Sequence, residues 1–122
     1  MIGSTRKLVV YAFAEPVDLR KGYNGLQALV ENQLRHDVTN GHLYLAVSRN
    51  RKRAKVLYWD GTGLCILMKR LEAGRFIAPW ARSSPTMTVS ELALFIEGSH
   101  ALKGTSLSPS PFFPSQIRSN QQ

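Results

Sequence analysis

The stretch Leu43–Leu71 decides the fold, and it reads LYLAVSRNRKRAKVLYWDGTGLCILMKRL. It opens with side chains that alternate at period two, the spacing of a β-strand. Two further runs, 56–59 and 64–71, are rich in strand-forming residues. The linkers between these runs, 49–53 and 60–63, are short, polar and turn-prone. The stretch therefore predicts an antiparallel meander of three strands.

Segments on either side of the meander add one strand and two helices. The segment 7–13 is rich in β-branched and aromatic residues and predicts a first strand. Apolar residues recur with helical spacing over 26–34. Near the other end, Thr88 and Glu91 have the spacing of a capping box, and Gly98 fits the end of a helix.

These elements predict an α+β domain in the order strand, helix, three strands, an optional strand at Arg75–Ile77, and helix. We expect a small antiparallel sheet of four to five strands with both helices packed on one face of it. Residues 99–122 are mostly small or polar residues and prolines, which bury too little apolar surface to fold. The sequence thus predicts a single domain over 1–98 and a flexible, disordered C-terminal tail over 99–122.

The chain is strongly basic. Its 16 Lys and Arg residues outnumber 8 Asp and Glu residues, which gives a formal net charge of +8. Such an excess favours nucleic acid as a partner, then an anionic membrane surface, while a charge that serves only solubility is the alternative. No apolar stretch approaches the roughly 18 residues of a membrane-spanning helix. A single cysteine, Cys65, excludes an intrachain disulfide and fits a cytoplasmic location.

The densest cluster of cations lies in the first linker of the meander. At a hairpin tip such side chains splay outward and reach several phosphates without reading base sequence. A second basic group follows in and after the third strand, where alternation sends neighbouring side chains to opposite faces. The candidate nucleic-acid-binding residues are Arg49, Asn50, Arg51, Lys52, Arg53, Lys55, Lys69, Arg70 and Arg75. A solvated basic turn that binds no ligand is the alternative.

The sequence contains few of the residue patterns that are typical of catalytic or metal sites. The acidic residues have no spacing that builds a metal-binding carboxylate set, and the histidines lack metal-ligand spacing. Cys65 lies within an apolar run and fits a small core side chain. The pair Tyr58-Trp59 suits stacking on bases, but a core or hairpin-end position explains it as well. We therefore expect no catalytic residue, no metal and no cofactor.

Four motifs carry a resemblance to a known family. They are PVDLRKG at 16–22, LYWDGTGL at 57–64, KRLEAGRF at 69–76 and ELAL at 91–94. With these motifs the chain resembles the accessory proteins of IS66-type insertion sequences, the TnpB or Orf2 type, over about residues 8–98. The resemblance implies a bacterial mobile genetic element. It also implies a small, non-catalytic protein that acts in transposition beside a separate transposase.

Two roles fit these observations. The first is a basic DNA-binding factor that holds duplex DNA at the element ends or at the target. The alternative is a protein–protein adapter that binds the IS66-type transposase without contacting DNA directly. A metal-dependent nuclease built on Asp60 and Glu72 is a third hypothesis, which the spacing of the acidic residues does not favour. No membrane partner is expected, and the sequence leaves open whether the protein forms homo-oligomers.

Overall fold

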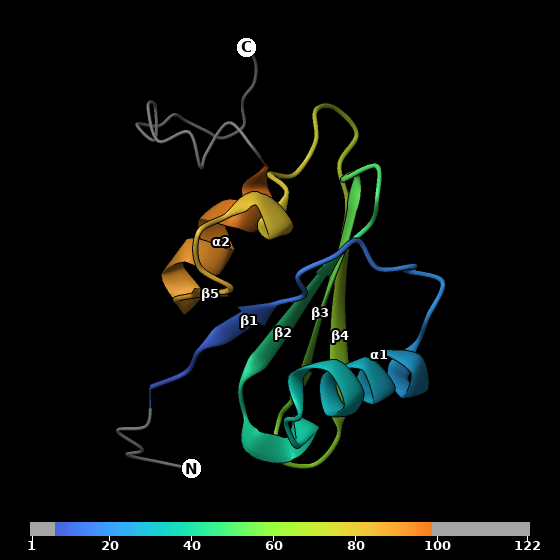
Figure 1. The fold of residues 1–122 in the computed structure, drawn as a ribbon, viewed down its shortest axis with the longest axis vertical. Helices are drawn as coiled ribbons and strands as arrows, with labels where there is room; N and C mark the ends of the chain where they lie inside the picture. The colour runs from blue at the N-terminus through green and yellow to red at the C-terminus, as the bar shows by residue number, and fades with distance from the viewer. Residues whose placement is uncertain (1–6, 99–122) are drawn as a thin grey trace.

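The computed structural model describes residues 7–98, which contain a five-stranded sheet of order β4-β3-β2-β1-β5 (Figure 1). The tail predicted over 99–122 lies outside the described residues. The strands are β1 (Val10–Ala12), β2 (Leu43–Val47), β3 (Arg53–Trp59), β4 (Leu64–Arg70) and β5 (Thr86–Met87). The helices are α1 (Tyr23–Leu29), which continues as a π-helical segment (Val30–Leu34), α2 (Val89–Glu97), and two 3-10 helices (Val38–Asn40 and Pro79–Ala81). The α+β class is confirmed.

The predicted meander is confirmed as β2, β3 and β4, each antiparallel to the next. The sheet is nevertheless mixed, because β1 pairs with β2 in parallel. The chain leaves β1, passes through α1 and returns to β2 in the same direction, and such a crossover connection makes the two strands parallel. The expectation of an antiparallel sheet is therefore wrong at this one pairing.

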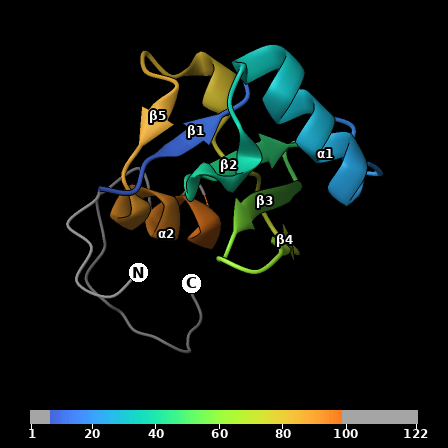
Figure 2. The same cartoon turned by 90° about the horizontal axis from the view of Figure 1, so that it is seen from below.

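The two helices lie on opposite faces of the sheet, which corrects the expectation that both pack on one face (Figure 2). The physical reason is visible in β2, where Tyr44, Leu45, Ala46 and Val47 are all buried. Tyr44 and Ala46 face α1, whereas Leu45 and Val47 face α2. A central strand that is apolar on both sides needs a cover on each face. All five residues of β2 are apolar or aromatic, so its sequence lacks the alternation of polar and apolar residues that is typical of a strand with one solvent-exposed face.

The optional strand at Arg75–Ile77 does not form. Phe76 is instead fully buried from a loop and stacks on Phe95 of α2, with ring centroids 5.3 Å apart. The fifth strand is β5, which pairs antiparallel with β1 at the other edge of the sheet. Phe76 therefore anchors the loop to the core, because the burial of a side chain does not require its backbone to pair in a sheet.

The predicted capping box at the start of α2 is confirmed. The Thr88 hydroxyl accepts a hydrogen bond of 3.0 Å from the Glu91 N–H, and the Glu91 carboxylate accepts one of 2.8 Å from the Thr88 N–H. These bonds satisfy two backbone donors that a helix start leaves unpaired. At the other end, Gly98 adopts φ 116°, a value that disfavours other residues.

Candidate nucleic-acid interface

The turn between β2 and β3 is shaped by its own polar side chains. The Asn50 carboxamide oxygen accepts hydrogen bonds from the Ser48 hydroxyl, at 2.8 Å, and from the Lys52 N–H, at 3.0 Å. The Ser48 hydroxyl oxygen also accepts from the Arg53 N–H at 3.2 Å. Asn50 therefore has a structural task in the turn, which the sequence analysis did not identify.

Two of the predicted cations in this turn are directed at the protein. The Arg51 guanidinium donates to the carbonyl of Phe76 at 3.1 Å, and the Lys52 ammonium donates to the carbonyl of Gly74 at 3.3 Å. The backbone reinforces both contacts, because the Arg51 carbonyl accepts from Phe76 and the Lys52 carbonyl accepts from Leu71. Arg51 and Lys52 thus fasten the turn to the loop 71–76.

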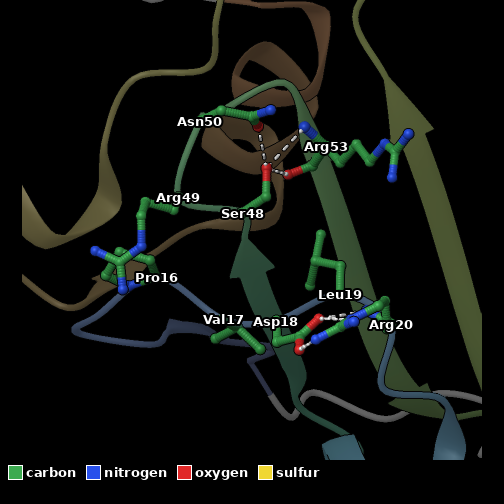
Figure 3. A pocket seen from close by; sticks show the side chains of 9 residues that line it. All are labelled: Pro16, Val17, Asp18, Leu19, Arg20, Ser48, Arg49, Asn50 and Arg53. Atoms are coloured by element: carbon green, nitrogen blue, oxygen red, sulfur yellow. Dashed lines mark hydrogen bonds and ion pairs between the residues drawn. The ribbon is translucent and has the colours of Figure 1, made fainter.

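Arg49 and Arg53 instead line a pocket beside the loop that connects β1 to α1. The Arg49 side chain lies next to Pro16 of this loop, whereas the Arg53 side chain extends in the opposite direction, toward β4 (Figure 3). That loop crosses in front of β3 and β4 (Figure 1), and together with the turn it forms a pocket of about 550 Å³ (Figure 3). The lining residues are Pro16, Val17, Asp18, Leu19, Arg20, Ser48, Arg49, Asn50 and Arg53. This lining combines apolar side chains with three arginines and one carboxylate, so its charge is net positive and suits an anion.

A second pocket of about 490 Å³ adjoins the first and shares Leu19 and Arg53 with it. Its other lining residues are Lys55, Met68, Arg70 and Glu72. We refer to the two pockets together as the basic groove. It runs from the β2–β3 turn across the α1 face of β3 and β4.

Strand register explains which cations reach the basic groove. Arg53 lies opposite Arg70 on β3 and β4, and both belong to the α1 face. The next pair is Ala54 with Lys69, and Ala54 lies in the core under α2. Lys69 therefore lies on the opposite face, as side-chain alternation predicted. Arg75 is exposed in the loop after β4 and lines neither pocket.

Several charges of the basic groove are already paired or hydrogen-bonded. Arg20 contacts Asp18 at 2.7 Å, Arg70 contacts Glu72 at 3.1 Å, and the Lys55 ammonium donates to the Lys21 carbonyl at 2.9 Å. Both ion pairs are exposed, so each adds little stability. Arg49 and Arg53 form no ion pair within residues 7–98 and are the best placed to meet an external anion.

The Asp18 carboxylate organises the wall of the groove. It accepts from the Arg20 side chain and from the Arg20 N–H, at 3.0 Å for the latter. The side-chain hydrogen bond of Arg20, followed by its backbone hydrogen bond, holds the pKa of Asp18 well below its usual range. The loop is also tied to β2, because the Val17 N–H donates to the Val47 carbonyl at 2.9 Å. The charge pattern of the sequence does not predict that residues 16–19 line the groove. The only signal for this loop in the sequence is the motif PVDLRKG.

The segment around Asp60 is structural. Asp60 accepts from the N–H groups of Thr62 and Gly63 and so closes the β3–β4 turn. Its other carboxylate oxygen lies 3.5 Å from the Cys65 sulfur. Partial burial and then the neighbouring Asp60 raise the pKa of the Cys65 thiol. Tyr58 packs against the core under α2, whereas Trp59 is the half-buried last residue of β3, at the start of the β3–β4 turn.

The described residues contain neither a metal-ligand cluster nor a membrane-spanning helix. Within 7–98, no group of three or more His, Cys, Asp or Glu side chains is placed to hold a metal ion. No helix in the same range is long and apolar enough to cross a membrane.

Comparison with known proteins places the chain in a family. A family model described as IS66 Orf2 like protein matches residues 8–104. The uncharacterized protein y4jC of Sinorhizobium fredii (strain NBRC 101917 / NGR234) is 36% identical over 99 residues, which cover 80% of this chain and 85% of y4jC. The uncharacterized protein y4hO of the same strain is 28% identical over 99 residues, or 80% of this chain and 86% of y4hO. No solved structure was found to match. Because the family model spans most of the chain and agrees with the motifs in the sequence, this chain belongs to the IS66 Orf2-like family.

Proposed function

We propose that this protein is a non-catalytic, DNA-binding accessory factor in the transposition of an IS66-type insertion sequence. Membership in the IS66 Orf2-like family implies the accessory role. The basic groove supports the DNA-binding part. In this proposal the protein acts in the cytoplasm beside a separate transposase and grips the phosphate backbone at the element ends or the target.

The observation that carries the proposal is that Arg49 and Arg53 both line the basic groove of a chain with a net positive charge. Neither residue is used in an ion pair within the described part of the chain. Guanidinium groups bind phosphate oxygens well because their donors form a planar fork. Lys55 and Arg70 extend the same surface along β3 and β4. Such contacts position a protein on DNA without reading sequence.

Duplex binding measured across a salt series tests the proposal. In the Arg49→Ala/Arg53→Ala variant, we expect weaker binding to element-end and scrambled duplexes alike. Each lost phosphate contact lowers the slope of log affinity against log salt by about 0.9. Arg51 is a poor choice for this test, since its side chain holds the loop 71–76 and its loss perturbs the fold.

The matched control is Lys7→Ala/Arg35→Asn, which removes the same charge away from the groove. Asn tolerates the positive φ of 58° that Arg35 adopts. If the control lowers affinity and slope as much as the groove variant does, net charge alone acts and the groove assignment is wrong. If the unaltered protein binds no duplex at low salt, the DNA-binding role is wrong. Capture by the transposase in the presence of nuclease would then support the adapter role.

A further inference from the structure

Strand β4 forms one edge of the sheet, and it pairs with β3 on one side only within the described residues. Its middle exposes two apolar side chains, with 47% of Leu67 and 67% of Met68 accessible. An edge strand presents a row of backbone donors and acceptors that pair readily with another strand. Natural proteins usually blunt such an edge, yet the apolar centre of β4 is open to a partner.

We propose that the edge of β4 pairs with β4 of a second copy of this chain, antiparallel about a two-fold axis at Leu67. This arrangement places Leu67 opposite itself and Met68 opposite Ile66 of the second copy. Arg70 then lies opposite Leu64. An interface in which the same patch meets itself is what a two-fold symmetric dimer requires. The exposed apolar side chains become covered in this register.

Charge complementarity favours the second copy as the occupant and supports this register. Lys69 lies opposite Cys65 of the second copy, and the Cys65 sulfur is 3.5 Å from an oxygen of Asp60. Lys69 and Cys65 share the α2 face, because their β3 partners Ala54 and Tyr58 both pack in that core. Lys69 forms no ion pair within 7–98. Two-fold symmetry therefore creates two Lys69–Asp60 ion pairs between the copies.

Registers with the axis on one of the two cations of β4 are less favourable. An axis at Lys69 or at Arg70 sets two like charges directly opposite each other, which destabilises strand pairing. The net charge of +8 on each copy opposes association at long range. Salt limits that repulsion, since the Debye length is about 8 Å at physiological ionic strength. The ion pairs and the apolar contacts act at shorter range than this.

The proposed dimer would affect how the protein binds DNA, but it does not depend on DNA binding. Antiparallel pairing of two edges about an axis normal to the sheet keeps each face on its own side. The basic grooves of both copies, which lie on the α1 face, would then share one surface of a continuous sheet. Two copies could therefore contact one duplex together. Self-association is measured without DNA, so the two proposals fail separately.

Cysteine crosslinking tests the register. In a Cys65→Ser background, Leu67→Cys places two thiols opposite each other on the axis. Opposed residues in an antiparallel pair have Cα atoms about 4.5–5.5 Å apart, within the range of a disulfide. Met68→Cys is the matched control, because its two copies are diagonal neighbours and lie beyond bridging distance. We expect a disulfide-linked dimer from Leu67→Cys and little from Met68→Cys. Equal crosslinking of both, or of neither, would overturn the register.

Sedimentation of the unaltered chain tests the dimer itself. We expect a dimer at moderate salt, and for Lys69→Glu a dissociation constant raised about tenfold or more, since two ion pairs become repulsive contacts. Lys7→Glu carries the same charge change far from β4 and should leave the dimer intact. Adding Asp60→Asn to Lys69→Glu should restore part of the affinity, because the turn keeps its acceptor while the repulsion is lost. A monomer at every concentration would overturn the proposal.

Discussion

Arg51 and Phe76 are joined by two hydrogen bonds that connect the basic turn to the core. The Phe76 N–H donates to the Arg51 carbonyl at 2.7 Å, and the Arg51 guanidinium donates to the Phe76 carbonyl at 3.1 Å. Arg51 adopts φ 59°, a left-handed conformation that is uncommon for residues other than glycine. The fully buried Phe76 ring fixes the other partner against Phe95. The turn that carries Arg49 is therefore held in place from the α2 core.

Substitutions of Arg51 should separate its side-chain bond from its backbone strain. Arg51→Ala loses the bond to Phe76 and keeps the strained φ, so we expect the free energy of unfolding to fall by about 1–3 kcal/mol. Arg51→Gly also loses the bond but relieves the strain, which for a left-handed residue is about 1 kcal/mol or more. Urea unfolding should therefore rank Gly above Ala. The reverse order would show that φ at this position is unstrained.

The Asp18 carboxyl should stay ionised in acid. Because Arg20 lowers its folded-state pKa, the contact stabilises the fold above the unfolded pKa of about 3.9. That contribution is lost as the pH falls through the folded-state pKa. Arg20→Gln should raise the Asp18 pKa toward its ordinary value in an NMR titration. The pKa of Asp37, which Thr39 lowers, is an internal control and should not move.

Neutralising Asp18 should strengthen DNA binding if the basic groove holds phosphate. Asp18→Asn keeps an oxygen acceptor for the Arg20 N–H, removes one negative charge from the groove and releases the Arg20 side chain from its ion pair. We expect a higher duplex affinity and a steeper salt dependence, by up to about one phosphate contact. Asp37→Asn, outside both pockets, is the charge-matched control. Equal gains from both variants would count against a role for the Asp18 loop.

Cys65 should react slowly with thiol reagents. Its raised pKa leaves little thiolate at neutral pH, and the thiolate is the reactive form. Asp60→Asn removes the adjacent charge while keeping an acceptor for the turn, so the reaction rate near pH 8 should increase. Asp37→Asn is a control that should leave the rate unchanged. No acceleration in Asp60→Asn would mean that partial burial alone sets the reactivity.

The capping box of α2 should make a measurable contribution to the free energy of unfolding. Thr88→Ala removes the hydroxyl that accepts from Glu91 and should cost about 1 kcal/mol in thermal or urea unfolding. Glu91→Gln retains an acceptor oxygen and should cost less. Ser90→Ala, an exposed position in the same helical turn, is the control for the change of residue type. A Thr88→Ala variant as stable as the Ser90→Ala variant would contradict the capping role.

The sequence by itself determined the local features of this protein. The strand runs and short linkers of 43–71 specify the meander, because consecutive strands that are joined by short turns can pair only with their neighbours, and antiparallel. Thr88, Glu91 and Gly98 specify the bounds of α2 through hydrogen bonds and backbone freedom that span only a few residues. The excess of Lys and Arg is a property of composition, and the motif PVDLRKG indicates the family.

Tertiary structure alone decided the arrangement of these parts. The parallel pairing of β1 with β2 and the position of α1 opposite α2 depend on contacts between segments far apart in the chain. The same holds for the cations, since strand register puts Arg53 and Arg70 in the groove and Lys69 on the other face. Arg51 and Lys52 face the protein because the loop 71–76 offers them carbonyl oxygens. The sequence shows how many charges the chain carries, but the packing of distant segments determines which group each charge contacts.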